Sequence, residues 1–426
     1  MQRVEGTAAT RAAIETANAA RAFTASPKIE AAVRQICDDV QTRGDNAVIE
    51  NCRQFDCPDL QIANLRVTET EIEAAWNALP AKAQGALQRA AANLDAFHRV
   101  QKPQDFTFDS PDGARLGNRW TPIERVGIYA PNGRAAYPST VLMLAMPARV
   151  AGVKDVVLAT PANKDGNAHP VILAAARVAC IREIYKVGAA AAMAALAYGT
   201  DTIPRVDKLV GPGSIYLTLA KKHLFGVVGV DGLYGPSEVA IVAEQGADAA
   251  QIAADLLAQA EHGSDSFVAF LTPSQNLLNE VEGEIETQSQ QSPRAQLARQ
   301  ALESSLLCRV ESMGAACELC DLIAAEHVEI WSDDAHKWAD HIPNAGAIFL
   351  NCPVPLGDYI IGPSHTLPTG ATARFASGVG VDTFLKRTSI IEAPKASIEK
   401  LADDLETIAL LEELPGHAAA VRRAAH

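Results

Sequence analysis

The pattern of hydrophobic and polar positions along the chain changes near residue 125. From there on, short apolar runs are separated by longer segments of good helix formers, which predicts buried strands followed by helices. The first series of strands is expected at 126–130, 155–159, 183–187 and 208–210, with helices from Pro138 and at 169–180, 189–198 and 214–224. Regular alternation of this kind implies a parallel sheet that helices cover on both faces.

A second series of the same kind begins at Val239. Its strands are expected at 239–243, 267–271, near Leu307, 327–331 and 347–350, and its helices at 248–260, 276–303 and 314–325. The segment 357–388 that follows is dense in Gly, Ser, Thr and Pro, which suits a ligand-facing surface. We therefore expect a second parallel sheet, followed by a loop-rich surface.

The two ends of the chain have a helical pattern. Residues 1–25 are Ala-rich and charged, which predicts a helical arm, and the C-terminal piece from about Ser397 is also helical. Thr68 and Glu71 have the spacing of a capping box, so a helix is expected from there to about His98, interrupted near Pro80. The expected fold class is α/β, with two parallel-sheet, incomplete Rossmann-like domains and helical N- and C-terminal extensions.

Length, charge and hydropathy limit the partners. At 426 residues the chain is too long for one ordinary core, so two or more domains are expected. The net charge of -14 argues against nucleic acid as a partner, because phosphate contacts need clustered Lys and Arg. The most apolar stretch, 141–153, is too short to cross a membrane, and the N-terminus lacks the apolar core of a signal peptide. We expect a cytoplasmic protein that binds neither nucleic acid nor membranes.

The eight cysteines are scattered along the chain, which suggests reduced thiols and not a disulfide framework. Cys317 and Cys320 form a lone CxxC within the expected helix 314–325. A structural or redox role for this pair competes with the simpler interpretation of two small residues in a helix.

Gln259 and His262 stand three residues apart at the end of the expected helix 248–260, so they share one helical face. An amide oxygen and an imidazole at this spacing can both reach one metal ion. The alternative is that His262 is only a helix-end or surface histidine. Further polar groups in loop contexts would suit a zinc site together with these two, namely Asp358, His365 and His417.

Glu326 and His327 are adjacent where a helix is expected to pass into a strand. A carboxylate beside an imidazole can move protons near neutral pH, so this pair is a candidate acid and base. The competing interpretation is a helix-terminal histidine next to an exposed glutamate. The strand-to-helix loops 131–134 and 211–214 could hold a phosphate on their backbone amides, or be simple turns.

Taken together, these segments resemble the histidinol dehydrogenase family from about residue 30 to His417. The motifs that carry the resemblance are GIYAPNGRAAYPSTVLMLAMPARVAGV at 127–153, VDKLVGPGSIY at 206–216, GPSEV at 235–239, LLAQAEHGSDS at 256–266, AAEHVEIW at 324–331, GDYIIGPSHTLPTG at 357–370 and EELPGH at 412–417. Several long motifs in one order are highly specific.

The resemblance implies a set of roles. Members of that family oxidise L-histidinol through the aldehyde to L-histidine and use two NAD molecules in turn. It implies that zinc is held by Gln259, His262, Asp358 and His417. It implies that the catalytic pair is Glu326 and His327. It implies substrate contacts at Ser237, Gln259, His262, His327, Asp358, His365, Glu412 and His417.

Two of the positions that contact the coenzyme in the family carry different residues here. Tyr129 is kept, whereas Ala191 stands where the family has a glutamine and Ser214 where it has an asparagine. Each lost polar contact would weaken NAD binding by roughly 1–3 kcal/mol if the group were buried and well paired. The coenzyme half of the site is therefore expected to differ from that of the family.

The resemblance also implies a division of the chain. Residues 26–128 and 239–378 are expected to form a metal and substrate domain, 129–238 an inserted domain for NAD, and 379–426 a helical segment that reaches the partner of an obligate homodimer. Two alternatives remain at this point. One is a paralogous zinc-dependent alcohol or amino-alcohol dehydrogenase with altered coenzyme use, and the other is a zinc- and histidinol-binding dimer without catalysis.

Overall fold

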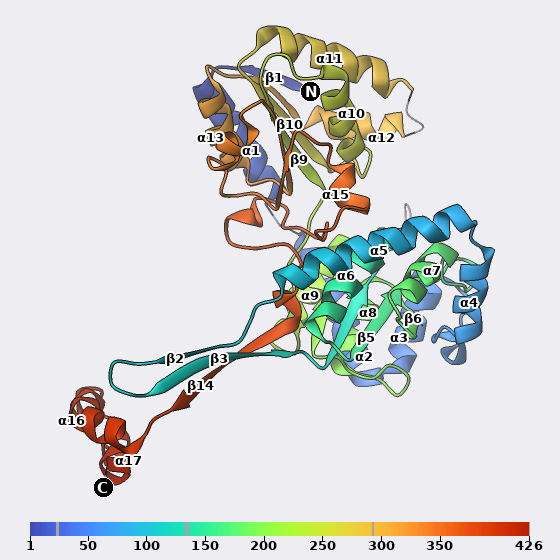
Figure 1. The fold of residues 1–426 in the computed structure, drawn as a ribbon. Coiled ribbons are helices and arrows are strands. Elements are labelled where there is room, and N and C mark those ends of the chain that lie inside the picture. The colour runs from blue at the N-terminus through green and yellow to red at the C-terminus, as the bar shows by residue number, and fades with distance from the viewer. Residues whose placement is uncertain (23–24, 133–135, 292–293, 426) are drawn as a thin grey trace.

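The computed structural model describes residues 1–22, 25–132, 136–291 and 294–425. It contains two α/β bodies, each built on its own sheet, and an arm that projects from one of them and ends in two helices (Figure 1). Neighbouring strands within both main sheets run parallel. The expected fold class, with two parallel-sheet α/β domains, is confirmed.

The six-stranded sheet has the order β1-β11-β10-β9-β12-β13. Its strands are β1 (Gln2–Glu5), β9 (Glu238–Ala243), β10 (Phe267–Thr272), β11 (Leu306–Arg309), β12 (His327–Trp331) and β13 (Ala347–Leu350). All of them except β1 lie where the apolar runs predicted strands. Residues 2–5 pair with β11 as an edge strand, so the expectation of a purely helical arm at 1–25 is wrong.

Helices cover both faces of this sheet. One face packs against α10 (Ala249–Ala260), α11 (Gln275–Ser289) and α12 (Ala295–Glu303). The helix α10 lies where a helix was predicted, whereas α11 and α12 together replace the single helix expected at 276–303. The other face packs against α1 (Thr7–Arg21), α13 (Met313–Ile323) and α14 (Ala335–Ala339). Ile14 of α1 is fully buried in that core, so α1 belongs to this body and does not extend from it.

The five-stranded sheet has the order β6-β5-β4-β7-β8. Its strands are β4 (Arg125–Tyr129), β5 (Asp155–Thr160), β6 (Glu183–Lys186), β7 (Lys208–Val210) and β8 (Gly229–Val230). The chain enters at β4, proceeds to one edge through β5 and β6, and returns to the other side of β4 at β7. The strand order therefore reverses between β4 and β7, and ligands of open α/β sheets bind at the carboxyl ends of the strands at such a point.

Eight helices within the described residues pack on the two faces of this sheet. On one face lie α4 (Glu69–Ala78), α5 (Ala81–Gln101), α6 (Pro138–Ala151) and α7 (Pro170–Val178). On the other lie α2 (Pro27–Arg43), α3 (Asp45–Phe55), α8 (Ala189–Tyr198) and α9 (Ile215–Leu224), with the short η1 (Ile62–Asn64) beside them. The capping box of Thr68 and Glu71 opens α4, and the break at Pro80 separates it from α5, both as predicted.

The packing of α2 to α5 differs from the expected division of the chain. The expected division groups the segment 26–128 with 239–378, but the apolar faces of these helices are buried against the five-stranded sheet. Val33, Cys37 and Val40 share a core with α8, and Leu94 shares one with Ile128 of β4. The helical pattern of the segment indicates an apolar face, but does not say which sheet will cover it.

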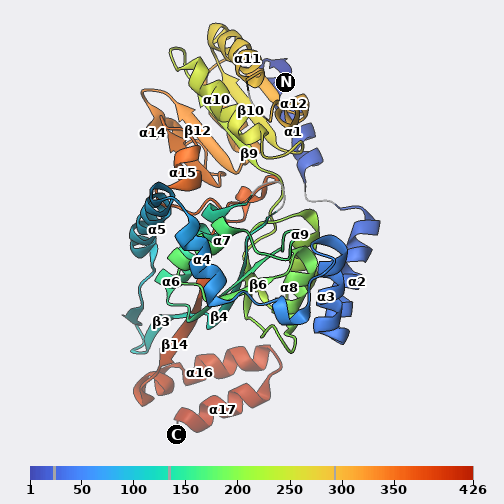
Figure 2. The same ribbon diagram turned by 90° about the vertical axis from the view of Figure 1, so that its right-hand side faces the viewer.

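The arm is an antiparallel sheet of β2 (Phe106–Asp109), β3 (Arg115–Pro122) and β14 (Leu385–Glu392), in the order β14-β3-β2. It carries α16 (Lys395–Leu411) and α17 (Pro415–Ala425) at its far end, away from both bodies (Figures 1 and 2). The segment 379–426 was expected to be helical, whereas its first part is the short η3 (Asp382–Phe384) and the strand β14. The remaining elements, α15 (Pro355–Tyr359) and η2 (Thr372–Arg374), lie in the loop-rich segment.

No helix in the described part of the chain combines the length and the apolar character needed to cross a membrane.

Candidate active site

A pocket of about 580 Å³ lies where the two bodies meet. The five-stranded sheet contributes residues that follow β4 and β7, namely Pro131, Pro212, Gly213 and Ser214. The six-stranded sheet contributes residues at the amino ends of its strands, namely Ser237 before β9, Ser266 before β10, and Glu326 and His327 at the start of β12. One sheet therefore presents its carboxyl edge to the pocket, and the other presents its amino edge.

Gln259 and His262 reach this pocket from the end of α10. Asp248 caps the start of that helix by accepting hydrogen bonds from the backbone N–H groups of Ala250 and Gln251, at 3.0 and 3.2 Å. Gln259 is buried, and its Oε1 has no hydrogen-bond partner among the described residues. His262 lies beyond the helix end, and its Nδ1 is 3.2 Å from Ser237 Oγ.

The loop-rich segment supplies Asp358 and His365. The Asp358 carbonyl accepts a hydrogen bond of 2.7 Å from His365 Nδ1, which fixes the histidine tautomer. The Thr140 hydroxyl then donates to His365 Nε2 at 3.3 Å. The Asp358 side chain faces the catalytic candidates, with its Oδ1 3.1 Å from His327 Nε2.

Glu326 and His327 follow the αL residue Ala324 that ends α13, and His327 is the first residue of β12. The Glu326 Oε2 accepts a hydrogen bond of 3.0 Å from the backbone N–H of Glu238, and His327 Nδ1 donates to the Glu238 carbonyl at 3.1 Å. Glu326 Oε2 and His327 Nδ1 are 3.6 Å apart. Both side chains are buried, so Glu326 is not the exposed glutamate of the competing interpretation.

Burial and mutual charge set the protonation of this cluster. Burial raises the pKa of Glu326 to about 8, although the neighbouring His327 opposes this shift. Burial lowers the pKa of His327, but the Glu326 and Asp358 carboxylates outweigh it and raise that pKa to about 9. Burial also raises the pKa of Asp358, yet His327 brings it below its ordinary value. Burial lowers the pKa values of His262 and His365, which therefore favour the neutral form.

These protonation states suit metal ligands. A metal ion takes neutral imidazole, ionised carboxylate and amide oxygen, and His262, Asp358 and the unpartnered Oε1 of Gln259 offer these three donors. Within the described residues, no group of three His, Cys, Asp or Glu side chains is arranged to hold a metal by itself. The donors gathered at this pocket therefore fit zinc, provided that a further ligand is added to them.

The sequence expected that further ligand to be His417, but one chain does not bring it to the pocket. His417 lies in α17, and Glu412 ends α16, so both belong to the helical end of the arm (Figure 1). Of the eight expected substrate-contact positions, the structure brings six to the pocket: Ser237, Gln259, His262, His327, Asp358 and His365. The two that it leaves outside are the two from the arm.

The three residues expected to contact the coenzyme lie in two different environments. Ser214 is exposed at the start of α9 and lines the pocket. Tyr129 and Ala191 are both buried in the core around α8. The Tyr129 hydroxyl accepts a hydrogen bond of 3.1 Å from the backbone N–H of Ala189, and Ala191 has no polar side-chain atom. In this structure Ser214 alone of the three presents a polar side chain to the pocket.

The loop 211–214 has a buried anchor. Asp231 accepts a hydrogen bond of 2.7 Å from the Gly211 N–H, and Lys221 donates to the Gly211 carbonyl at 2.9 Å. Gly211 itself has φ of 124°, and a Cβ there would lie 2.7 Å from the Tyr129 carbonyl oxygen. The loop 131–134 lies partly outside the described residues, since Gly133 and Arg134 are not described.

Sequence reasoning missed Glu238 and Thr140. Glu238 is the first residue of β9, which is otherwise apolar. Because an unpaired carboxylate is costly to bury, a charged residue at this position indicates that it has a specific partner, and this could have been noticed in the sequence. Thr140 in the apolar helix α6 gives no such signal. Cys317 and Cys320 are buried free thiols in α13, and burial raises the pKa of Cys317 to about 11, which supports two small helical residues and not a reactive pair.

The chain is similar to known proteins over most of its length. The family model described as histidinol dehydrogenase matches residues 19–424. The histidinol dehydrogenase of Synechococcus sp. is 47% identical over 396 residues, which cover 92% of this chain and 91% of that protein. The histidinol dehydrogenase of Rhodopseudomonas palustris is 46% identical over 396 residues, with 92% of each chain covered.

A solved structure is similar over the whole chain. The crystal structure of histidinol dehydrogenase from Elizabethkingia anophelis has a TM-score of 0.94 and 35% sequence identity. The superposition covers 100% of this chain and 98% of that one. The chain therefore belongs to the histidinol dehydrogenase family of oxidoreductases.

Proposed function

We propose that this chain oxidises L-histidinol through L-histidinal to L-histidine in histidine biosynthesis, with zinc bound at the pocket and two NAD molecules used in turn. The observation that carries the proposal is the buried, unpartnered Oε1 of Gln259, beside neutral His262, ionised Asp358 and the Glu326–His327 pair. An amide oxygen is costly to bury without a partner, so this arrangement calls for a cation.

Zinc would be held by Gln259, His262 and Asp358 of one chain and by His417 of a second copy. A bound zinc ion would act as a Lewis acid that holds the polar groups of the substrate in one orientation. The proton transfers of the reaction are assigned to side chains that line the pocket.

In the first oxidation, the deprotonated form of His327 takes the hydroxyl proton of the alcohol as the substrate carbon gives a hydride to NAD. In the second, the ionised form of Glu326 takes a proton from water as the water oxygen attacks the aldehyde carbon. The resulting hydrate gives a second hydride to a second NAD and leaves the carboxylate. One alcohol, one water and two oxidised coenzymes are thus converted to one carboxylate, two reduced coenzymes and three protons. Because the pKa of His327 is raised to about 9 and that of Glu326 to about 8, both basic forms increase as the pH rises toward these values.

NAD is assigned to the carboxyl edge of the five-stranded sheet. Support comes from the reversal of strand order between β4 and β7 and from the glycine-containing loop 211–214 at the start of α9. Ser214 and backbone groups of this loop would make the contacts, since Tyr129 and Ala191 are buried.

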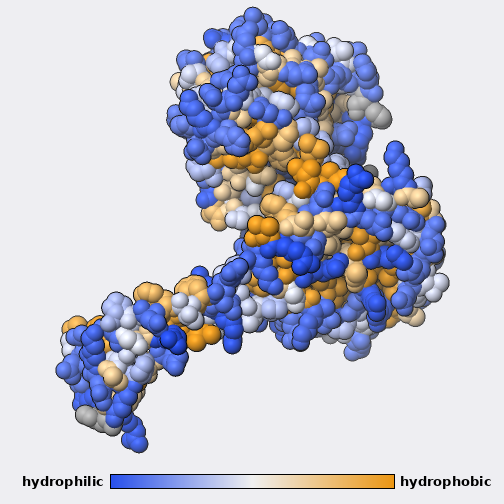
Figure 3. Space-filling model, viewed as in Figure 1, coloured by the Kyte–Doolittle hydropathy of each residue, from blue (hydrophilic) through white to orange (hydrophobic). Residues whose placement is uncertain are grey.

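A homodimer is assigned because the arm carries two site residues and an uncovered apolar surface. Ile408, Leu411 and Leu414 on α16 and after it are 40–80% exposed. Figure 3 shows the arm standing apart from the rest of the molecule, with apolar residues along it. A second copy would cover this surface and receive Glu412 and His417 at its pocket.

The test is NAD reduction by the purified protein with L-histidinol, before and after chelation and again after zinc is restored. Two reduced coenzymes per histidinol, lost with the chelator and recovered with zinc, are the expected result. One reduced coenzyme per histidinol, or full activity in a protein shown by atomic absorption to be free of metal, would refute the proposal.

A second candidate is a related alcohol or amino-alcohol dehydrogenase with altered coenzyme use. It is favoured by Ala191, which has no polar side-chain atom at the position where the family has a glutamine. A screen of NAD, NADP and other alcohols separates the two. Histidinol binding that depends on zinc, with no reduction of NAD and reduction of another coenzyme, would select this alternative.

A further inference from the structure

The last residue of α1 contacts three elements that approach the active site. Arg21 Nη1 forms an ion pair of 2.5 Å with Glu238 Oε1 at the start of β9. Its Nη2 donates to the Ile323 carbonyl at the end of α13, at 3.2 Å. Its guanidinium also stacks over the Phe267 ring at the start of β10, 4.2 Å from the ring centre. One side chain thus joins α1 to the amino ends of two strands and to the helix that precedes Glu326.

Glu238 is the link between this contact and the catalytic pair. Its backbone N–H donates to Glu326 Oε2, and its carbonyl accepts from His327 Nδ1. Its own carboxylate is fixed by Arg21 and by the Gly370 N–H, which donates to Oε1 at 2.8 Å. The orientation of the Glu238 backbone therefore sets where the Glu326 carboxylate and the His327 ring point.

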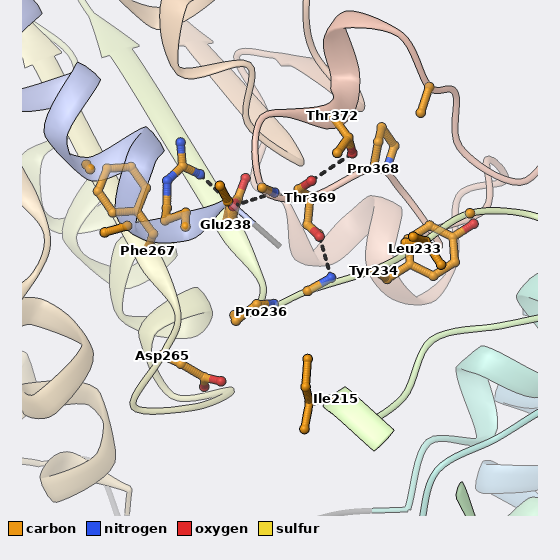
Figure 4. A pocket seen from close by; sticks show the side chains of 18 of the residues that line it. Ile215, Leu233, Tyr234, Pro236, Glu238, Asp265, Phe267, Pro368, Thr369 and Thr372 are labelled. Carbon is orange, nitrogen blue, oxygen red and sulfur yellow. Dashed lines mark hydrogen bonds and ion pairs between the residues drawn. The ribbon is translucent and has the colours of Figure 1, made fainter. Parts of the chain in front are cut away.

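We propose that Arg21 and Glu238 are positioning residues, which hold Glu326 and His327 in their reactive orientation through the backbone of Glu238. The assignment rests on the function proposed above. Neither side chain need touch the substrate, because Arg21 and Glu238 line an adjoining, larger cavity of about 1090 Å³ and are not among the residues that line the active-site pocket, although the two cavities share residues such as Ser214 and Thr369. Figure 4 shows Glu238 and Phe267 together at one end of this cavity.

To hold Glu238 in place, the Arg21 side chain must be positively charged; a neutral side chain of the same volume would not be enough. The Glu238 side chain is 2% exposed, and its Oε2 has no hydrogen-bond partner within the described residues. Without Arg21 a carboxylate would be left buried close to the carboxylate of Glu326, which is strongly unfavourable. Glu238 would then turn toward water in the large cavity, and the backbone hydrogen bonds to Glu326 and His327 would be lost.

This mechanism predicts a specific pattern among variants. Arg21→Met keeps much of the side-chain volume but leaves Glu238 unpaired, so we expect kcat with histidinol to fall about 10- to 100-fold, the loss typical of a catalytic group displaced by about 1 Å. KM for histidinol and zinc content should stay unchanged, because the zinc ligands are not affected. Arg21→Lys keeps the charge and should recover most of kcat.

The decisive variant is the double change Arg21→Met with Glu238→Gln. A glutamine at 238 has no charge to neutralise and can still accept from the Gly370 N–H through its amide oxygen. We expect the double variant to be several-fold faster than Arg21→Met alone. If it is as slow as, or slower than, the single variant, the positioning role is wrong.

The matched control is Arg11→Met on the same helix, where Arg11 pairs with the exposed Glu318 at the surface. It should leave kcat and thermal stability as they are. An equal loss of kcat in Arg11→Met and Arg21→Met would show that α1 acts only through general stability.

A second readout separates this inference from the proposed function. In protein labelled on the histidine rings, the His327 resonance is identified by its absence in His327→Asn. Its shift should change in Arg21→Met and return in the double variant, whether or not histidinol is the substrate. If the wild type does not oxidise histidinol but the resonance follows this pattern, the proposed function fails and the positioning role stands. An unchanged resonance in Arg21→Met refutes the positioning role.

Discussion

The two sheets contribute to the pocket in different ways. The six-stranded sheet presents the amino ends of its strands and places ionisable side chains there, with Glu326 and His327 held by the backbone of Glu238. The five-stranded sheet presents the carboxyl ends of its strands and offers glycine-rich backbone, with Ser214 as a polar side chain. Proton transfer and metal binding need side chains of defined pKa, whereas a coenzyme phosphate can be held by backbone N–H groups.

This difference predicts unequal responses to mutation. Changes to the ionisable side chains that the six-stranded sheet places in the pocket (the side-chain half) should abolish metal binding or one chemical step while the fold persists. Changes to the loops that follow strands of the five-stranded sheet (the backbone half) should alter the shape of these loops and thereby the affinity for the coenzyme.

His262→Asn should remove zinc and histidinol binding together and lower kcat/KM by more than about 1000-fold, because one ligand of the site is lost and the others no longer hold the metal. The measurement is zinc content by atomic absorption, with histidinol binding by calorimetry. His336→Asn, at an exposed position of α14, is the control and should keep zinc. Stoichiometric zinc in His262→Asn would contradict the ligand assignment.

Glu326→Gln should slow oxidation of the aldehyde by about 100- to 10,000-fold, since an amide cannot act as the base that activates water. Oxidation of the alcohol should change much less, because His327 takes that proton. Single-turnover reduction of NAD, started from histidinol and separately from histidinal, measures the two steps. Equal loss in both steps would remove the assigned role of Glu326.

Gly211→Ala should disturb the backbone half. A Cβ at this position would lie 2.7 Å from the Tyr129 carbonyl oxygen and 2.9 Å from the Leu144 side chain, and φ is 124°. The loop must move, so we expect KM for NAD to rise about 10-fold while zinc content is unchanged. The control is Gly226→Ala, which has φ of 100° but nothing within 4 Å of the added Cβ. A similar rise in KM for both variants would show that backbone strain in general, and not this loop, is responsible.

The smallest effect is expected at Asp56, which lies beside Gly188 at the start of α8. Burial raises the pKa of Asp56 from 3.8 to about 6, so between these values the folded chain binds more protons than the unfolded chain. Stability from this group is therefore present below pH 3.8 and is lost as the pH rises through about 6.

Asp56→Asn removes that pH dependence. At pH 7 the variant should be more stable by about 1–2 kcal/mol, after allowance for partial solvent exposure of the carboxylate. Calorimetric Tm values of wild type and variant should converge near pH 4 and separate as the pH rises. The exposed Asp59→Asn is the control, and a separation of the same size there would contradict this explanation.

Much of the fold could be predicted from the sequence, because buried parallel strands are apolar runs with clear ends. β9, β10 and β12 lie where these runs are, and the Thr68–Glu71 spacing does open a helix. Strand β1 could not be found this way, since Gln2–Glu5 is a polar edge strand that exists only by pairing with β11, far away in sequence. The strands of the arm are exposed on most positions and give no apolar signal either.

Part of the grouping of candidate residues was predictable as well. The spacing of Gln259 and His262 on one helical face, and the adjacency of Glu326 and His327, make them candidates, and the structure brings all four to one pocket. The hydrogen bond of Tyr129 with Ala189, and the hydrogen bonds of the Glu238 backbone with Glu326 and His327, depend on contacts between distant segments. No local sequence pattern encodes such contacts, so the sequence alone does not predict them.

The position of the arm has a genetic consequence. If each pocket is completed by the arm of a second copy, a chain with His327 replaced still carries a sound arm, and a chain with His417 replaced still carries a sound pocket. Two inactive alleles of these kinds, expressed together, should then restore growth without histidine, because mixed pairs contain one intact site. Two alleles that both alter the pocket should not.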